Sequence, residues 1–281
     1  MNRGCFIKRR LARLFFTTVV LFVGAQSYGV EHDLSDTPLF TLAGVDPNIV
    51  LTMDDSGSMA WSFMPSSIDD KPFTKRAKSP AFNKIYYDRK VVYDPPVDDK
   101  GVSLGNSKFT EAWDDGFNQA GCKVNLSTKF APTWGGNKRD HCTDEGDDAS
   151  RYPLFSGDEE PAYYYIFDNS VVAGVCDGTI DDDGCYTKVV VSDSSGQGET
   201  VDERDNFANW YSYYRKRVYV TKTAATLSFA RFNANIRAGY QQINLVAPLP
   251  VRTFSGNDRK AFFNSLMNLE AGGGTPLRKA M

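Results

Sequence analysis

A short apolar segment that runs directly into oxygen-bearing side chains constrains this chain more than any other feature of its sequence. Residues 48–53 read as an apolar strand, and Asp54, Ser56 and Ser58 follow at intervals of two, with Gly57 where a tight turn needs glycine. One carboxylate and two hydroxyls suit a hard cation such as Mg²⁺, which takes oxygen ligands. Open α/β sheets bind ligands outside the carboxyl ends of their strands, so an α/β fold with a divalent-cation site is predicted here.

A second loop, far along the chain, favours the cation site over the simpler interpretation, a polar turn made of ordinary turn residues. Residues 272–277 read Gly-Gly-Gly-Thr-Pro-Leu, with Thr275 where a helix N-cap belongs. The pairing of Asp-x-Ser-x-Ser with a later Gly-Gly-Thr-Pro-Leu resembles the metal-ion-dependent adhesion site of von Willebrand factor A domains. The resemblance implies that Ser56, Ser58 and Thr275 coordinate Mg²⁺, with Mn²⁺ or Ca²⁺ as alternatives. It also implies that Asp54 lies close to the ion, often through water, and that an acidic group of a protein partner fills an open position.

The N-terminus has the form of a secretory signal. Five Lys and Arg residues between positions 3 and 13 precede an apolar core at 14–23, and small residues follow at 25, 27 and 29. A retained membrane anchor needs about 20 apolar residues, more than this run offers. Cleavage that removes residues 1–29 takes five positive charges from a net charge of −3 and leaves about −8. We therefore expect an acidic exported protein that binds no nucleic acid and meets a membrane only through its export signal.

Cysteine usage agrees with export. Four cysteines remain after the signal, namely Cys122, Cys142, Cys176 and Cys185, and an even number in an exported chain favours disulfides. Three connectivities are open. We favour Cys122–Cys142 with Cys176–Cys185, because each pair closes a short polar loop. Zinc is the alternative, but these spacings lack the pattern of zinc-finger ligands.

The chain between the two loops divides into several parts. Residues 30–59 form a lead-in, the first strand and the metal loop. Residues 60–199 read as loops and short strands rich in Gly, Asp, Pro and Tyr, with a strand at 188–192. Structureless stretches of this length are rare in compact domains, so we expect an inserted subdomain stapled by the disulfides. The aspartates at 181–183 read as a solvated acidic turn, and a calcium loop is the less favoured alternative.

Regular structure is expected again in residues 200–281. A capping-box pattern at 200–203 opens a predicted helix over 203–232, which is followed by a strand at 236–246 and a helix at 258–269. The apolar face of the first helix, expected to pack on a sheet, comprises Phe207, Tyr211, Tyr214, Val218 and Ala225. This order predicts an open, doubly wound A-like domain that is incomplete at its C-terminus. We expect the chain to be a fragment, since half of such a sheet leaves an exposed edge strand.

Several segments, taken in order, carry a more specific resemblance. They are Asp-Asp-Ser-Gly-Ser-Met at 54–59, Ile-Tyr-Tyr-Asp at 85–88, Cys-Tyr-Thr at 185–187, Glu-Arg-Asp-Asn-Phe-Ala-Asn-Trp-Tyr-Ser-Tyr-Tyr-Arg at 203–215 and Gly-Gly-Gly-Thr-Pro-Leu-Arg at 272–278. Together they resemble the N-terminal part of the PilY/PilC family of type IV pilus tip proteins. The resemblance implies export to the periplasm, outer-membrane surface or pilus tip of a Gram-negative bacterium. It also implies minor pilins and host or abiotic surfaces as partners, and a C-terminal β-propeller in full members.

The sequence therefore predicts a non-enzymatic, metal-dependent adhesion and assembly module of the type IV pilus, active in pilus biogenesis, twitching motility and surface adhesion. One alternative is a generic secreted binding protein of the von Willebrand factor A type. Another is a structural pilus component in which the metal loop is vestigial and the insertion makes the contacts. A metal-dependent hydrolase is disfavoured, because the two histidines, His32 and His141, lie near no recognisable nucleophile motif.

Overall fold

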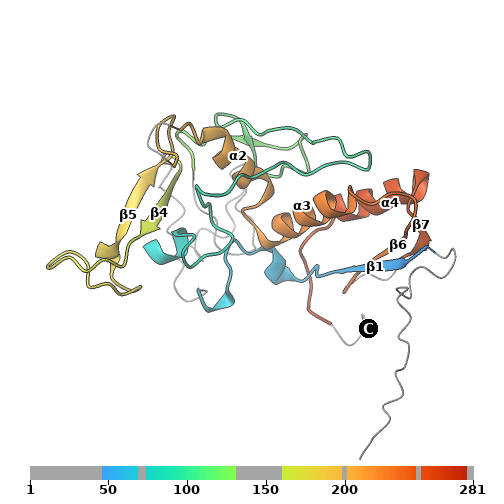
Figure 1. Cartoon of the computed structure of the whole chain (residues 1–281), viewed down its shortest axis with the longest axis horizontal. Helices are drawn as coiled ribbons and strands as arrows, with labels where there is room; N and C mark the ends of the chain where they lie inside the picture. Colours follow the sequence, from blue (N-terminus) through green and yellow to red (C-terminus); the bar gives the residue numbers. More distant parts are fainter. Residues whose placement is uncertain (1–45, 69–73, 131–159, 198–200, 245–247, 277–281) are drawn as a thin grey trace, which may run out of the picture. The chain divides into compact units, whose positions relative to one another are not determined.

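The computed structural model describes residues 46–68, 74–130, 160–197, 201–244 and 248–276 (Figure 1). In these ranges the chain is a mixed α/β protein with three small sheets. Its strands are β1 (Asn48–Met53), β2 (Ala112–Trp113), β3 (Lys123–Val124), β4 (Tyr163–Phe167), β5 (Tyr186–Val190), β6 (Arg237–Gln242) and β7 (Leu249–Thr253). Its α-helices are α2 (Arg204–Tyr213), α3 (Arg217–Phe229) and α4 (Gly256–Met267). Among these residues, none of the helices has the length and apolar character needed to cross a bilayer. The predicted signal lies outside the described ranges.

The largest sheet has the strand order β1-β6-β7 and supports the candidate site. β1 and β6 run parallel, starting with Asn48 beside Arg237, and β7 runs antiparallel to β6 at the edge. β6 covers the first part of the strand predicted at 236–246. β7 escapes prediction from the sequence because it is short and contains Pro250, a residue that sheets accept chiefly in edge strands.

This sheet buries one of its faces against α3 and α4 (Figure 1). Successive strand residues point to opposite faces, so Met53 is 3% exposed whereas Val50 is 54% exposed. The buried cluster comprises Met53, Val218, Tyr219, Phe229, Ile236, Ala238, Tyr240, Phe254, Phe262, Phe263, Leu266 and Leu269. Several of its aromatic rings gather near the start of β6, where the Phe254 N–H donates to the Ile236 carbonyl at 2.9 Å and the Phe254 ring packs against Phe262. α4 confirms the helix predicted at 258–269 to within two residues.

The long helix predicted at 203–232 is two helices, and the prediction that its whole apolar face packs on the sheet is wrong. Arg215 explains the break, because its guanidinium donates to the Tyr211 carbonyl at 2.6 Å, where the helical pattern would place a backbone N–H. The same guanidinium pairs with the buried carboxylate of Asp114 at 2.6 Å. Phe207 and Tyr211 of α2 consequently pack among aromatic residues that precede the helix, whereas Val218 of α3 packs on the sheet.

Thr200 of the capping box predicted at 200–203 lies outside the described residues, and Glu203 does not take the position that the box gives it. α2 begins at Arg204, and Glu203 is the N-cap residue without a side-chain cap bond. The Glu203 side chain instead turns into the aromatic cluster, where it is 4% exposed and accepts hydrogen bonds from Tyr87, Tyr164 and Ser195. The Glu203 carboxylate therefore bonds to side chains elsewhere in the sequence, whereas the capping-box pattern predicted a bond to a backbone N–H at the start of the helix.

Residues before α2 contribute two antiparallel pairs, β2 with β3 and β4 with β5. β5 corresponds to the strand predicted at 188–192, displaced by two residues towards the N-terminus. The Cys176–Cys185 disulfide predicted from the sequence closes the loop between β4 and β5. Cys122 is also disulfide-bonded, and Cys142, its predicted partner, lies outside the described residues.

Candidate metal centre

The loop after β1 folds its polar side chains into a compact turn. The Asp54 carboxylate accepts the backbone N–H of Ser56 at 2.8 Å, and the hydroxyls of Ser56 and Ser58 lie 3.1 Å apart. A single 3₁₀ turn, η2 (Gly57–Ala60), fixes this arrangement, because the Met59 N–H bonds to the Ser56 carbonyl at 2.9 Å. Ser56 is only 2% exposed, so its hydroxyl is held in place by the surrounding protein. The two hydroxyls are thus neighbours that share a hydrogen bond in the turn.

The distance between these hydroxyls fits a small octahedral cation. Neighbouring ligands about 2.1 Å from Mg²⁺ lie about 3 Å apart in octahedral geometry, whereas the longer bonds of Ca²⁺ spread them further. The hydroxyls of Ser56 and Ser58, at 3.1 Å, match the shorter spacing. Asp54 is partly buried beside them and supplies a negative charge. The oxygen-only character of the three side chains matches a hard cation rather than a soft transition metal.

The glycine loop that carries Thr275 lies directly against the loop after β1. The Gly57 N–H donates to the Gly273 carbonyl at 3.1 Å, and the Gly272 N–H donates to the Asp55 carbonyl at 2.7 Å. Gly273 has a φ of +83°, a conformation that favours glycine and lets the loop turn close to its neighbour. Thr275 follows in the same exposed stretch. Two segments more than 200 residues apart in sequence are therefore joined by backbone hydrogen bonds at the end of β1.

Sequence reasoning missed one residue of this site, Asn244. The backbone N–H of Asn244 donates to Asp55 Oδ1 at 3.1 Å, and its side-chain amide donates to the same oxygen at 2.8 Å. The amide also donates to the Gly274 carbonyl at 2.8 Å. The strand predicted at 236–246 concealed Asn244, because β6 ends at Gln242 and Asn244 lies in the turn beyond it. The available signal was the asparagine itself, a residue type depleted in strands, inside the strand predicted at 236–246.

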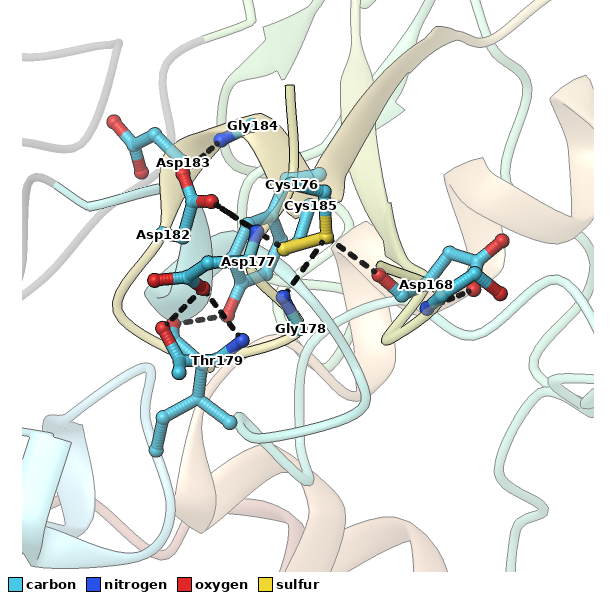
Figure 2. The surroundings of a disulfide bond; sticks show 12 residues. Asp168, Cys176, Asp177, Gly178, Thr179, Asp182, Asp183, Gly184 and Cys185 are labelled. Carbon is cyan, nitrogen blue, oxygen red and sulfur yellow. Dashed lines mark hydrogen bonds between the residues drawn. A yellow bond between two sulfur atoms is a disulfide. The ribbon is translucent and has the colours of Figure 1, made fainter. Parts of the chain in front are cut away.

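A second group of potential ligands surrounds the disulfide (Figure 2). Ligand atoms of Cys176, Asp182 and Cys185 lie within 4.8 Å of one another, but the two sulfurs are bonded together and offer no thiolates for zinc. Asp182 accepts the N–H groups of Asp177 at 2.7 Å and Gly184 at 2.8 Å, so its carboxylate stabilises the turn. Bonds from the Thr179 hydroxyl and N–H lower the pKa of Asp177 and keep it ionised. This loop is a cross-linked acidic turn.

The chain is thus a mixed α/β protein in which the loop after β1 and the glycine loop that carries Thr275 meet at the end of the parallel strands β1 and β6. Over 93% of its length the chain is 34% identical to "Type IV pilus biogenesis factor PilY1" of Pseudomonas aeruginosa strain PAK. It is 32% identical over 94% of its length to the protein of the same name from strain UCBPP-PA14. The chain is therefore a relative of the PilY/PilC family, and it spans 22% of the length of these curated relatives. No family model matches, nor does any solved structure.

Proposed function

We propose that this chain is a non-enzymatic module of the type IV pilus machinery. It binds a divalent cation, for which Mg²⁺ is the favoured candidate, and uses the ion in adhesion and assembly. The name of the curated relatives supports the link to pilus biogenesis. The observation that carries the metal site is the pair of hydroxyls on Ser56 and Ser58, 3.1 Å apart, packed against the glycine loop that bears Thr275. Pilus biogenesis, twitching motility and adhesion to host or abiotic surfaces are the processes that it would serve.

The ion would act as a bridge between this chain and a protein partner such as a minor pilin. Ser56, Ser58 and Thr275 would hold it, and Asp54 would offset part of its charge. Mg²⁺ keeps several water ligands when few protein groups bind it, so a carboxylate of the partner can replace one of them. Neutral hydroxyl ligands leave most of the cationic charge for that carboxylate. These residues provide metal ligands and a negative charge, which are the groups that a cation-binding site needs.

Export and a position at the periplasm, outer-membrane surface or pilus tip are part of the same proposal. They rest on the predicted signal over residues 1–29 and on the pilus-related names of the relatives. Because the chain spans 22% of the length of those relatives, we assign to it the metal-dependent contact and not the whole activity.

Calorimetric titration with Mg²⁺ tests the metal site. We expect one Mg²⁺ to bind the wild-type chain, and we expect Asp54→Ala and Ser56→Ala to abolish binding while the far-ultraviolet circular dichroism is retained. Ser67→Ala is the matched control, because Ser67 is exposed and lies outside both loops. Mg²⁺ affinity that is unchanged in Asp54→Ala and Ser56→Ala would rule out the proposed ligands.

One observation favours the alternative in which the region between the metal loop and α2 makes the essential contacts. Val171, Val172 and Val175 are 74%, 50% and 60% exposed on a turn that the Cys176–Cys185 disulfide holds. The turn is closed by two backbone hydrogen bonds of 2.9 Å between Val172 and Cys176. Clustered exposed apolar side chains mark interaction sites more often than scattered ones do, and a rigid turn loses little entropy on binding.

Twitching motility, measured in a strain that expresses the complete protein, distinguishes the metal bridge from the contact surface formed by the exposed valines. If the metal bridge is essential, Asp54→Ala stops twitching and the triple change V171S/V172S/V175S has a smaller effect. The reverse result, with twitching lost only in the triple variant, would favour the contact surface. Val102→Ser is the control for exposed valines, since Val102 is 59% exposed on a different loop.

A further inference from the structure

We propose that Asn244 is a positioning residue that ties the two metal loops together and sets the geometry of their ligands. This inference rests on the proposed cation site and names a residue that neither the sequence motif nor the resemblance assigns to it. The Asn244 side-chain amide donates 2.8 Å hydrogen bonds to both loops, to Asp55 Oδ1 on one side and to the Gly274 carbonyl on the other.

The parallel pairing of β1 and β6 brings Asn244 to this position. The Ile243 N–H donates to the Met53 carbonyl at 3.0 Å, which extends the pairing one residue beyond the last residue of β6. Asn244 therefore emerges level with Asp55, and its backbone N–H reaches Asp55 Oδ1 at 3.1 Å. The rigid sheet, through this residue, determines where the loop after β1 lies.

Asn244 acts on the predicted ligands through their immediate neighbours. Asp55 lies between Asp54 and Ser56, and it is held by its carboxylate to Asn244 and by its carbonyl to the Gly272 N–H at 2.7 Å. On the other loop, the Gly274 carbonyl belongs to the planar peptide that leads into Thr275, so fixing this carbonyl fixes that peptide plane. One side chain thus lies one residue away from ligands on both loops.

The chemistry of this position suits asparagine. A side-chain amide has two N–H donors, and here one is directed to each loop. Alanine has neither donor, and serine has a single one. Asp55 is 6% exposed, so its carboxylate depends on protein donors for the hydrogen bonds that water would otherwise provide. Loss of the amide should therefore loosen both loops at once.

Mg²⁺ titration of the full chain tests this role, with thermal unfolding measured in parallel. We expect Asn244→Ala to weaken Mg²⁺ binding by about 10–100-fold, the usual cost of losing a group that orients metal ligands. Asn235→Ala is the matched control, because Asn235 is exposed just before β6, and its Mg²⁺ affinity should stay within about twofold of wild type. Asn244→Ser, which retains one donor, should give an intermediate affinity.

The outcomes separate this inference from the proposed function. If the wild-type chain takes up no Mg²⁺, both are overturned. If Ser56→Ala abolishes binding while Asn244→Ala and Asn244→Ser bind like wild type, the metal site stands and the positioning role is overturned. If Asn244 has a purely structural role, its variants have a lower melting temperature in the absence of Mg²⁺ but bind Mg²⁺ with unchanged affinity. That result also overturns the positioning role. Asn244→Ser keeps the test decisive if Asn244→Ala fails to fold.

Discussion

The carboxylate of Glu203 accepts a 3.0 Å hydrogen bond from the hydroxyl of Tyr87, which lies 116 residues earlier in the chain. Tyr164 and Ser195 donate to the same carboxylate, so three separate segments meet at the start of α2. A negative charge at a helix N-terminus is also favoured by the helix dipole. Glu203 therefore anchors α2 within the aromatic cluster and away from the sheet.

Replacement of Glu203 should be costly. Glu203→Ala removes the carboxylate that accepts from the buried hydroxyl of Tyr87 and leaves the Tyr164 hydroxyl with the longer contact to the Ser195 carbonyl at 3.4 Å, so we expect the free energy of unfolding to fall by about 3 kcal/mol. Urea denaturation of the full chain measures the change. Glu111→Ala is the control, because Glu111 makes an exposed ion pair with Lys123 at 3.2 Å and should cost less than about 1 kcal/mol. Equal losses in the two variants would contradict the anchoring role.

Stability should decline at alkaline pH. Burial, and then the charge of Glu203, raise the pKa of Tyr87 and Tyr164, and burial with nearby Asp94 raises the pKa of Tyr214 to about 12. The folded pKa lies above the unfolded value of about 10, so this stabilisation is complete below about pH 10 and is lost as the pH rises towards 12. Urea midpoints across that range, with tyrosinate absorbance, test the sign. Tyr214→Phe should flatten the dependence, and an unchanged slope would assign it to other groups.

Two Asp–Arg pairs of equal length offer a matched test of burial. Asp114 and Arg215 meet at 2.6 Å with side chains 7% and 3% exposed, whereas Asp202 and Arg204 meet at 2.6 Å with side chains 50% and 44% exposed. We expect Arg215→Ala to lower the free energy of unfolding by about 3–5 kcal/mol, because it leaves a buried charge without its partner. Arg204→Ala should cost less than about 1 kcal/mol. Similar costs for both, measured by urea denaturation, would show that burial does not decide the strength of these pairs.

Local patterns in the sequence predicted the elements whose causes are local. The apolar strand β1, the turn after it, the helix α4 and the disulfide that closes the short loop between Cys176 and Cys185 all appear in the structure. The two loops of the predicted site adjoin, and cation binding by Ser56, Ser58 and Thr275 stays a prediction.

The features that escaped prediction depend on distant partners. The Arg215 guanidinium, which takes the Tyr211 carbonyl at the break after α2, is also paired with Asp114 across 101 residues, and Asn244 reaches Asp55 across 189. A helical window contains neither Asp114 nor the β1 loop, so no periodicity could reveal these contacts. The buried role of Glu203 has the same origin, because its tyrosine partners lie far away in the sequence.

The glycine loop provides a test in which two adjacent residues are changed in the same way. Gly273 has a φ of +83°, and its carbonyl accepts the Gly57 N–H at 3.1 Å; Gly272 has no positive φ, and a Cβ there would meet nothing within 4 Å. Gly273→Ala forces a side chain into the left-handed region at a cost of about 1–2 kcal/mol, whereas Gly272→Ala should change stability by less than about 0.5 kcal/mol.

If the strain at Gly273 is relieved by a shift of this loop, Thr275 moves with it. We then expect Mg²⁺ affinity, measured by calorimetry, to fall in Gly273→Ala and to stay near the wild-type value in Gly272→Ala. Equal affinities in the two variants, with the expected difference in melting temperature, would mean that the position of the glycine loop does not control the ion.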